Sequence, residues 1–221
     1  MKRLLNAYQY LGPLILGPLA AWAWVAHYGS WVPALPALLV PVIHAYVVPA
    51  VGTNVLGMWE FDTRVKLGKF RPHHGFVFGS TTALIAWPLI GAPLAAPDPT
   101  AALASSLRVG AVLLAVNWAY DAVAMRHGIL KVYTPAATRG AGHWRAAADY
   151  VLPFFGLFGV IYAGGLRLAE PWLATAGLGT ALAVTLALSA ACIGLTSAAY
   201  VAGSFLVYGH AGLRPEPKEG S

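Results

Sequence analysis

Long apolar runs, separated by short polar segments, dominate this chain. Several of the runs approach or exceed the roughly 20 residues that a helix needs to cross about 30 Å of hydrocarbon. The pattern therefore predicts an all-α fold, a polytopic bundle of transmembrane helices. The expected spans lie within Leu11–Tyr28, Trp31–Met58, Gly75–Ala96, Leu107–Met125, Tyr150–Leu166 and the longer run Trp172–Tyr208.

The last run decides the number of spans. As a single helix, Trp172–Tyr208 would be about 55 Å long at 1.5 Å per residue, longer than an ordinary bilayer requires. We expect it to divide near Cys192–Ser197, which gives seven spans; one long, tilted helix, giving six, is the alternative. Residues 1–211 are expected to form a single transmembrane domain, and residues 212–221, rich in Pro, Glu and Lys, a flexible tail.

Basic residues predict the orientation. Lys2-Arg3, the loop with Arg64–Arg71 and the loop with Arg126–Arg145 share one side, whereas only Arg108 and Arg167 lie on the other. The positive-inside rule places the N-terminus in the cytoplasm and, with seven spans, the C-terminus outside. We expect an integral protein of a bacterial or archaeal cytoplasmic membrane. Its net charge of +6 is attributed to orientation and lipid headgroups, not to nucleic acid, and the sequence does not specify an oligomeric state.

Ionisable residues gather in two polar islands, Trp59–His74 and Asp121–Asp149. In a chain that is 58% hydrophobic and only 10% charged, such clusters need water or an enclosed polar cavity. The connector between Asp121 and Asp149 is long, and connectors of that length are usually functional or disordered. Its aromatic residues and its two membrane-anchored ends favour an ordered one.

Two carboxylates frame the second island. Asp121 closes one expected span and Asp149 opens the next, so both carboxyl groups lie at facing helix ends. Partly desolvated there, they are candidates for a proton donor and a base. The alternative is structural, in which each aspartate pairs with Arg126, Lys131 or Arg145 at the interface.

Aromatic residues accompany these acids. Trp118, Tyr120, Tyr133 and Tyr150 could present π-faces that stabilise a carbocation or bind an apolar substrate. The alternative for a membrane tryptophan such as Trp118 is an interfacial anchor.

The first island adds a third candidate acid, Glu60, with Trp59 beside it as a candidate substrate contact. The alternative is a solvated basic connector. The adjacent pair His73-His74 lacks the spacing of a di-iron site, and no aspartate-rich motif is present to hold magnesium and diphosphate. We therefore expect no metal and no cofactor.

One histidine lies within an expected span. His44 is in the middle of Trp31–Met58, a run with four prolines that tend to kink a helix and could open a cavity. An ionisable group at that depth indicates a functional site, and Asn117 raises the same question; a neutral, hydrogen-bonded histidine is the alternative. A weak echo between Trp59-Glu60 and Tyr120-Asp121, each followed by a glycine, suggests an internal repeat.

The second island resembles a known family. The order Tyr120-Asp121, Gly128, Tyr133, Pro135, Gly140 and Asp149 is similar to the membrane-embedded lycopene cyclases of the small, two-half type, over about a fifth of the chain. In that family a Trp-Asp begins the motif and a Glu-Glu pair closes it. The resemblance implies acid-base cyclisation of a polyene, with Asp121 matching the first acid and Asp149 the second of the pair.

This chain departs from the family in two places, and a second family offers a shorter match. Tyr120 replaces the usual tryptophan and Ala148-Asp149 replaces the glutamate pair, so the substrate need not be lycopene. Trp59-Glu60 is similar to a Trp-Glu of integral membrane terpene cyclases in meroterpenoid pathways.

Together these features predict an integral membrane enzyme that acts on a hydrophobic isoprenoid or terpenoid substrate. The leading hypothesis is a cofactor-independent terpene or carotenoid cyclase of the isomerase or lyase type, with Asp121, Asp149 and Glu60 as catalytic acids. One alternative is a small transporter or proton-coupled carrier that uses His44. Another is a lipid-headgroup enzyme that clamps phosphate with Arg64, Lys66 and Arg71. The enzyme hypothesis expects its three carboxyl groups to converge on one aromatic-lined cavity.

Overall fold

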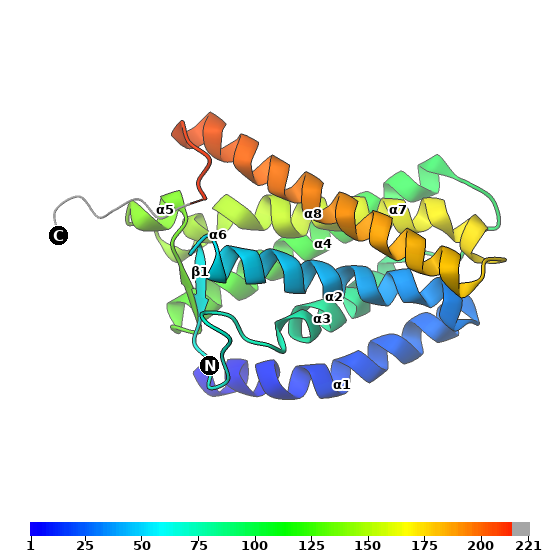
Figure 1. The fold of residues 1–221 in the computed structure, drawn as a ribbon, viewed down its shortest axis with the longest axis horizontal. Helices are drawn as coiled ribbons and strands as arrows, with labels where there is room; N and C mark the ends of the chain where they lie inside the picture. Colours follow the sequence, from blue (N-terminus) through cyan, green and yellow to red (C-terminus); the bar gives the residue numbers. More distant parts are fainter. Residues whose placement is uncertain (214–221) are drawn as a thin grey trace.

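The computed structural model describes residues 1–213 and confirms the all-α bundle (Figure 1). Four helical stretches, α2, α4, α8 and the continuous His143–Leu173, are long and apolar enough to cross a membrane. The elements in chain order are α1 (Lys2–Tyr28), α2 (Trp31–Asn54), β1 (Trp59–Phe61), α3 (His74–Ile90), α4 (Pro99–Arg126), β2 (Leu130–Val132), α5 (Pro135–Thr138), α6 (His143–Val151), the π-helix η1 (Leu152–Leu157), α7 (Phe158–Leu173) and α8 (Leu178–Tyr208).

The expected break near Cys192–Ser197 is wrong, because α8 runs unbroken for 31 residues. The segment contains no proline, and the Thr196 hydroxyl donates to the Cys192 carbonyl one turn earlier, at 2.7 Å, which leaves the helical ladder intact. Because α6, η1 and α7 also form one continuous rod, the bundle has six rods. The end of α8 therefore lies at the same end of the bundle as the start of α1, not at the opposite end (Figure 1). Most of the expected tail, residues 214–221, lies outside the described residues.

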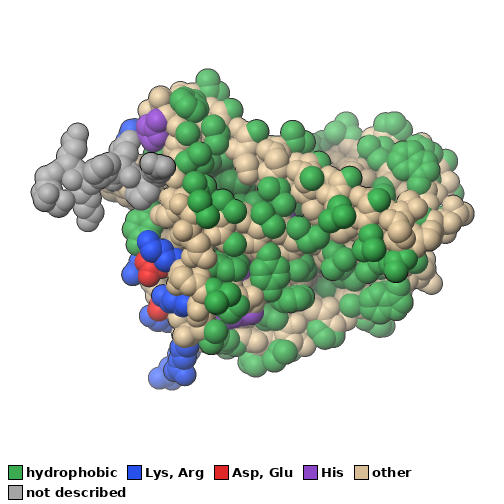
Figure 2. Space-filling model, in the orientation of Figure 1, with side chains coloured by type: hydrophobic (Ala, Val, Ile, Leu, Met, Phe, Trp, Pro, Cys, Tyr) green, Lys and Arg blue, Asp and Glu red, His purple; other side chains and the backbone are tan. Residues whose placement is uncertain are grey.

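The two polar islands meet in a short antiparallel ladder. β1 pairs with β2 so that Trp59 lies opposite Val132, Glu60 opposite Lys131 and Phe61 opposite Leu130. We call this the hairpin end of the bundle. Lys and Arg side chains gather there, whereas apolar side chains cover the rest of the visible face (Figure 2). The suggested repeat is not seen in the fold, because Trp59-Glu60 lies in a strand and Tyr120-Asp121 in a helix.

Small residues bring α4 and the rod of η1 and α7 close together. A β-carbon on Gly110 would lie 2.9 Å from the Gly156 carbonyl oxygen, and one on Gly159 would lie 2.8 Å from the Gly110 Cα. Only glycine permits such an approach, which is a common way to pack helices in lipid. The π-helix, which contains Pro153, alters the helical register where the chain turns Phe154 and Phe155 toward the bundle interior.

A buried ion pair holds the opposite end together. Arg167 Nη1 lies 2.6 Å from Glu170 Oε2 on α7 and donates to the Ala92 carbonyl. Glu170 also accepts hydrogen bonds from the Tyr28 hydroxyl at 2.8 Å and from the Leu94 amide at 2.9 Å. These bonds attach α1 and the loop between α3 and α4 to α7.

Candidate active site

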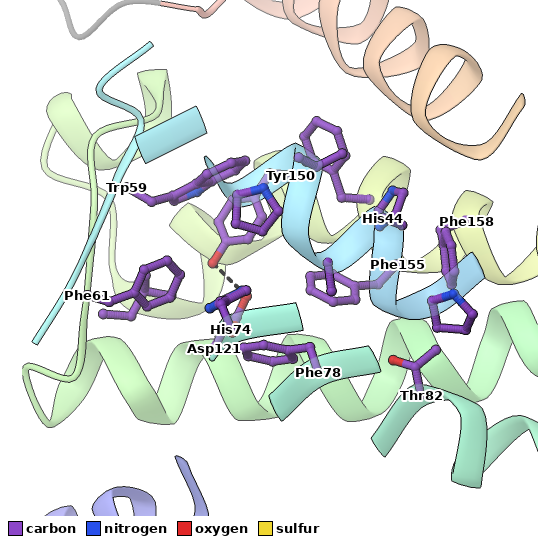
Figure 3. Close-up of a pocket in the computed structure, with 16 residues that line it drawn as sticks. His44, Trp59, Phe61, His74, Phe78, Thr82, Asp121, Tyr150, Phe155 and Phe158 are labelled. Atoms are coloured by element: carbon purple, nitrogen blue, oxygen red, sulfur yellow. Dashed lines mark hydrogen bonds between the residues drawn. The ribbon is translucent and has the colours of Figure 1, made fainter. Parts of the chain in front are cut away.

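An apolar cavity of about 60 Å³ lies in the half of the bundle near the hairpin end (Figure 3). One face of α2, at the helical spacing of residues 41, 44, 45, 48 and 49, forms one wall. Aromatic side chains from β1, α3, α6, η1 and α7 form most of the rest. The lining residues are Pro41, His44, Ala45, Val48, Pro49, Trp59, Phe61, His74, Phe78, Thr82, Asp121, Leu130, Tyr150, Phe154, Phe155 and Phe158.

Asp121 supplies the only carboxylate among the described residues that line this cavity. Asp121 is 3% exposed, and its Oδ2 accepts a 2.8 Å hydrogen bond from the Tyr150 hydroxyl. The Tyr150 ring in turn packs edge-on against Trp59, with the ring centroids 5.4 Å apart. Asp121 comes from the C-terminal part of α4 and Tyr150 from the end of α6, so this bond ties the two helices together.

A buried cation lies behind Asp121. Arg71 is 1% exposed; its Nε donates to His74 Nδ1 and its Nη1 to Gln9 Oε1, both at 2.8 Å. Its guanidinium carbon also lies 4.7 Å from the centre of the Phe61 ring. Burial lowers the pKa of Arg71, and Tyr120, then Tyr8 and the negative charge of Asp121, oppose that effect. An arginine remains charged even so, so a fixed positive charge lies behind the cavity wall at His74.

The Arg71 bond also assigns the His74 tautomer. Because Nδ1 accepts the hydrogen bond, a neutral His74 ring carries its proton on Nε2. His74 is buried against Phe61 and Phe78, with ring centroids 4.6 and 4.8 Å away. It is therefore held in a single orientation at the cavity wall.

His44 lies on the other side of the cavity, near Phe158 and Thr82 (Figure 3). Its ring centroid is 4.3 Å from that of Phe158, and its Nε2 is 3.4 Å from the Thr196 hydroxyl of α8. The histidine singled out from its depth in the sequence is thus a cavity residue with one weak polar partner.

Asp149 lies elsewhere. Its Oδ2 accepts a 2.8 Å hydrogen bond from the Ala136 amide at the start of α5, and its Oδ1 accepts one of 2.6 Å from the Tyr208 hydroxyl at the end of α8. Arg145, one turn earlier, is 3.8 Å from the same Oδ1. The structure does not bring the two aspartates together at the cavity, and the two hydrogen bonds that Asp149 accepts join α6 to α5 and to α8.

Glu60 also faces away from the cavity. Side chains alternate along a strand, so with Trp59 and Phe61 directed inward, Glu60 points to the other face of β1. There it accepts a 3.3 Å hydrogen bond from the Tyr133 hydroxyl and lies 3.6 and 3.9 Å from the ammonium groups of Lys66 and Lys131. Burial, with the negative charge of Glu60 in addition, raises the pKa of Tyr133.

Three further candidates contact protein, not the cavity. The Trp118 indole donates to the Trp144 carbonyl at 2.8 Å near the surface. Asn117 donates to the Leu113 carbonyl of its own helix at 2.8 Å. Tyr120 packs edge-on against Tyr8 and Phe78, at 5.7 and 5.4 Å between ring centroids. Of the ten candidate residues, the cavity therefore contains Asp121, Trp59, Tyr150 and His44.

Sequence reasoning missed several cavity residues. The i, i+4 spacing of Phe154 and Phe158 could have indicated one aromatic helix face, but the intervening π-helix has no sequence signature that we recognise. Arg71 and His74 belong to the first polar island, where the sequence suggests a phosphate clamp or a solvated connector and gives no sign that these two side chains are buried. Their burial depends on Gln9 of α1, a contact distant in sequence. Among residues 1–213, no group of three His, Cys, Asp or Glu side chains is arranged to hold a metal.

No family model, no curated protein and no solved structure matches this chain. The chemistry of the cavity is therefore argued from its own residues.

Proposed function

We propose that this chain is an integral membrane enzyme that protonates a double bond of an isoprenoid-type lipid and cyclises it. The observation that supports this most strongly is the position of Asp121, a single buried carboxyl group facing an apolar, aromatic cavity and oriented by Tyr150. Such a group can deliver a proton to an apolar substrate in a site that contains few competing bases.

The proposed reaction conserves all atoms of the substrate. Asp121 transfers its proton to one carbon of a terminal double bond, leaving a carbocation on the other. The electron pair of a second double bond then attacks that cation and forms the ring carbon–carbon bond. The ring cation loses a neighbouring proton to the Asp121 carboxylate, so the product is an isomer of the substrate and the acid is regenerated.

The surroundings of Asp121 suit both halves of this cycle. Aromatic rings in the lining that Arg71 does not cover, Trp59 and Phe155 among them, stabilise the transient cation without acting as bases. The guanidinium of Arg71 and the Tyr150 hydroxyl stabilise the carboxylate after the proton has left. An apolar lining also limits the water that would capture the cation.

The orientation of the bundle in the membrane is part of the same proposal. The hairpin end carries the N-terminal Lys2 and the basic loops, so we place it on the cytoplasmic side by the positive-inside rule. Arg71 is buried in this arrangement and bonded to His74 and Gln9, so it is not available for a surface phosphate clamp with Arg64 and Lys66, which argues against the headgroup-enzyme hypothesis.

A proton-coupled carrier is the second candidate, because His44 lines the same cavity. A carrier would move a solute across the bilayer without converting it. Proteoliposomes containing the wild type or the His44→Ala variant test this directly. Solute flux that depends on His44, together with no product formation, would favour the carrier over the enzyme.

The test of the enzyme is to express the protein in a host that accumulates linear polyenes and to analyse the extracted lipids. Asp121→Asn keeps an acceptor for Tyr150 but removes the proton donor. The matched control is Asp98→Asn, because Asp98 is an exposed helix N-cap and asparagine caps equally well. We expect a cyclic product with the wild type and the control, and at least about a hundredfold less with Asp121→Asn. Unchanged polyenes across a broad substrate panel, with intact wild-type protein, would contradict the proposal.

A further inference from the structure

A second hollow, a cleft of about 260 Å³, lies between α2 and α8 beside the cavity. It shares Val48, Trp59 and Phe154 with the cavity, so these three residues border both spaces. The remaining lining residues are Val47, Val51, Gly52, Leu56, Met58, Ile193, Ser197, Tyr200, Val201 and Leu213.

The cleft lies between α2 and α8, two helices that are long and apolar enough to cross a membrane. Val47 and Val51 on its α2 rim are 40% and 42% exposed. Tyr200 presents mainly its ring, because its hydroxyl donates to the Gly212 carbonyl at 2.9 Å. A groove lined by aliphatic side chains and open to hydrocarbon is suited to an extended apolar chain.

Trp59 stands where the cleft and the cavity meet. Its ring occupies the space that a β-carbon on Gly52 would fill, and it packs edge-on against Tyr150 and Phe154 at 5.4 and 5.8 Å between ring centroids. The indole N–H is buried and has no acceptor in the part of the chain that the structure describes. An indole can only donate, and a buried donor without an acceptor costs free energy.

We propose that the cleft binds a single-chain lipid from the bilayer. This lipid carries an oxygen atom that accepts a hydrogen bond from the Trp59 indole N–H. The apolar tail lies between α2 and α8, and the reacting end enters the cavity toward Asp121. The reaction in this inference is the one in the proposed function, on which the inference rests. The inference narrows the substrate class from any isoprenoid to one that bears an oxygen atom.

Photolabelling in lipid nanodiscs tests the cleft. The probe is an isoprenoid alcohol with a diazirine on its chain, applied to the Asp121→Asn protein so that no turnover is needed. We expect labelled peptides from α2 and α8, and about tenfold less labelling when Val51→Trp fills the rim. The matched control, Val116→Trp, is on α4 at a residue 44% exposed that lines neither hollow, and should label normally. Labelling spread evenly over the lipid-facing surface would overturn the proposal.

Competition tests the oxygen. An unlabelled isoprenoid alcohol should displace the probe about five- to tenfold better than the matching hydrocarbon, as expected for one hydrogen bond. That preference should disappear in Trp59→Phe. If the alcohol and the hydrocarbon displace the probe equally well from the Asp121→Asn protein with Trp59 intact, the oxygen assignment is overturned. This comparison does not require the Trp59→Phe variant to fold. Labelling of the cleft without any cyclic product from the wild type would count against the proposed function alone.

Discussion

The Tyr150 hydroxyl donates a 2.8 Å hydrogen bond to Oδ2 of Asp121, joining α6 to α4 at the edge of the aromatic cavity. This bond fixes the position of one carboxylate oxygen, Oδ2. It joins the two ends of the second polar island differently from the expected pair of acids: Asp121 supplies the acid, and Tyr150, next to Asp149, supplies the phenol that orients it.

Replacing Tyr150 with phenylalanine tests this positioning role. The ring remains against Trp59, but Asp121 loses its donor, so we expect cyclisation to fall about ten- to a hundredfold. Product formation by the purified protein measures the rate, and thermal unfolding in detergent reports the fold. A well-folded Tyr150→Phe protein with wild-type turnover would contradict the role.

Asp149 is expected to matter for stability. Asp149→Ala leaves the Ala136 amide and the Tyr208 hydroxyl without their acceptor, so the free energy of unfolding should fall by about 2–4 kcal/mol. Turnover per folded molecule should stay within about threefold of the wild type. The control is Asp149→Asn, which retains one acceptor oxygen and should lose less stability. If folded Asp149→Asn loses turnover as severely as Asp121→Asn, Asp149 has a catalytic role that the geometry does not indicate.

Glu60→Gln should be nearly silent. Glu60 makes partly exposed ion pairs with Lys66 and Lys131, and such pairs contribute about 1 kcal/mol or less. We expect unchanged turnover and a small change in unfolding midpoint. A large loss of product with normal stability would place Glu60 in the reaction.

The ion pair at the opposite end should respond strongly to single substitutions. Arg167→Met leaves Glu170 buried without its cation, which should cost about 3–5 kcal/mol of folding stability. Because apolar residues can replace a buried pair, the double variant Arg167→Met/Glu170→Met should recover most of that loss. Unfolding measurements on the single and double variants decide this, and additive losses would contradict it.

The apolar runs predicted the bundle because transmembrane helices depend mainly on local composition. The same reasoning placed a break in α8, since length alone does not reveal how far a helix extends or tilts. Length and hydropathy also extended the second expected span to Met58, whereas α2 ends at Asn54 and the chain continues to strand β1 at Trp59. The pairing of β1 with β2 joins segments about 70 residues apart, and no local pattern encodes such a contact.

The candidate site was predictable only in part, for the same reason. Asp121 and His44 were identified because ionisable groups are costly within apolar segments. The burial of Arg71 depends on Gln9 and His74, and the inward direction of Trp59 depends on the strand that turns Glu60 outward. These relationships arise from tertiary packing, which also gives Asp149 its partners on α5 and α8.

Transfer of a proton from Asp121 to carbon is the central claim, and solvent deuterium tests it most directly. The purified protein in nanodiscs is supplied with the polyene that it converts, in D₂O, and the product is analysed by mass spectrometry. The protein is equilibrated in D₂O first, so that the Asp121 carboxyl carries deuterium, and the product of a single turnover is examined. We expect a cyclic product with one deuterium bound to carbon for the wild type and for Asp98→Asn, and no such product for Asp121→Asn. Cyclic product without deuterium from the wild type, or deuterated product at the wild-type rate from Asp121→Asn, would contradict it.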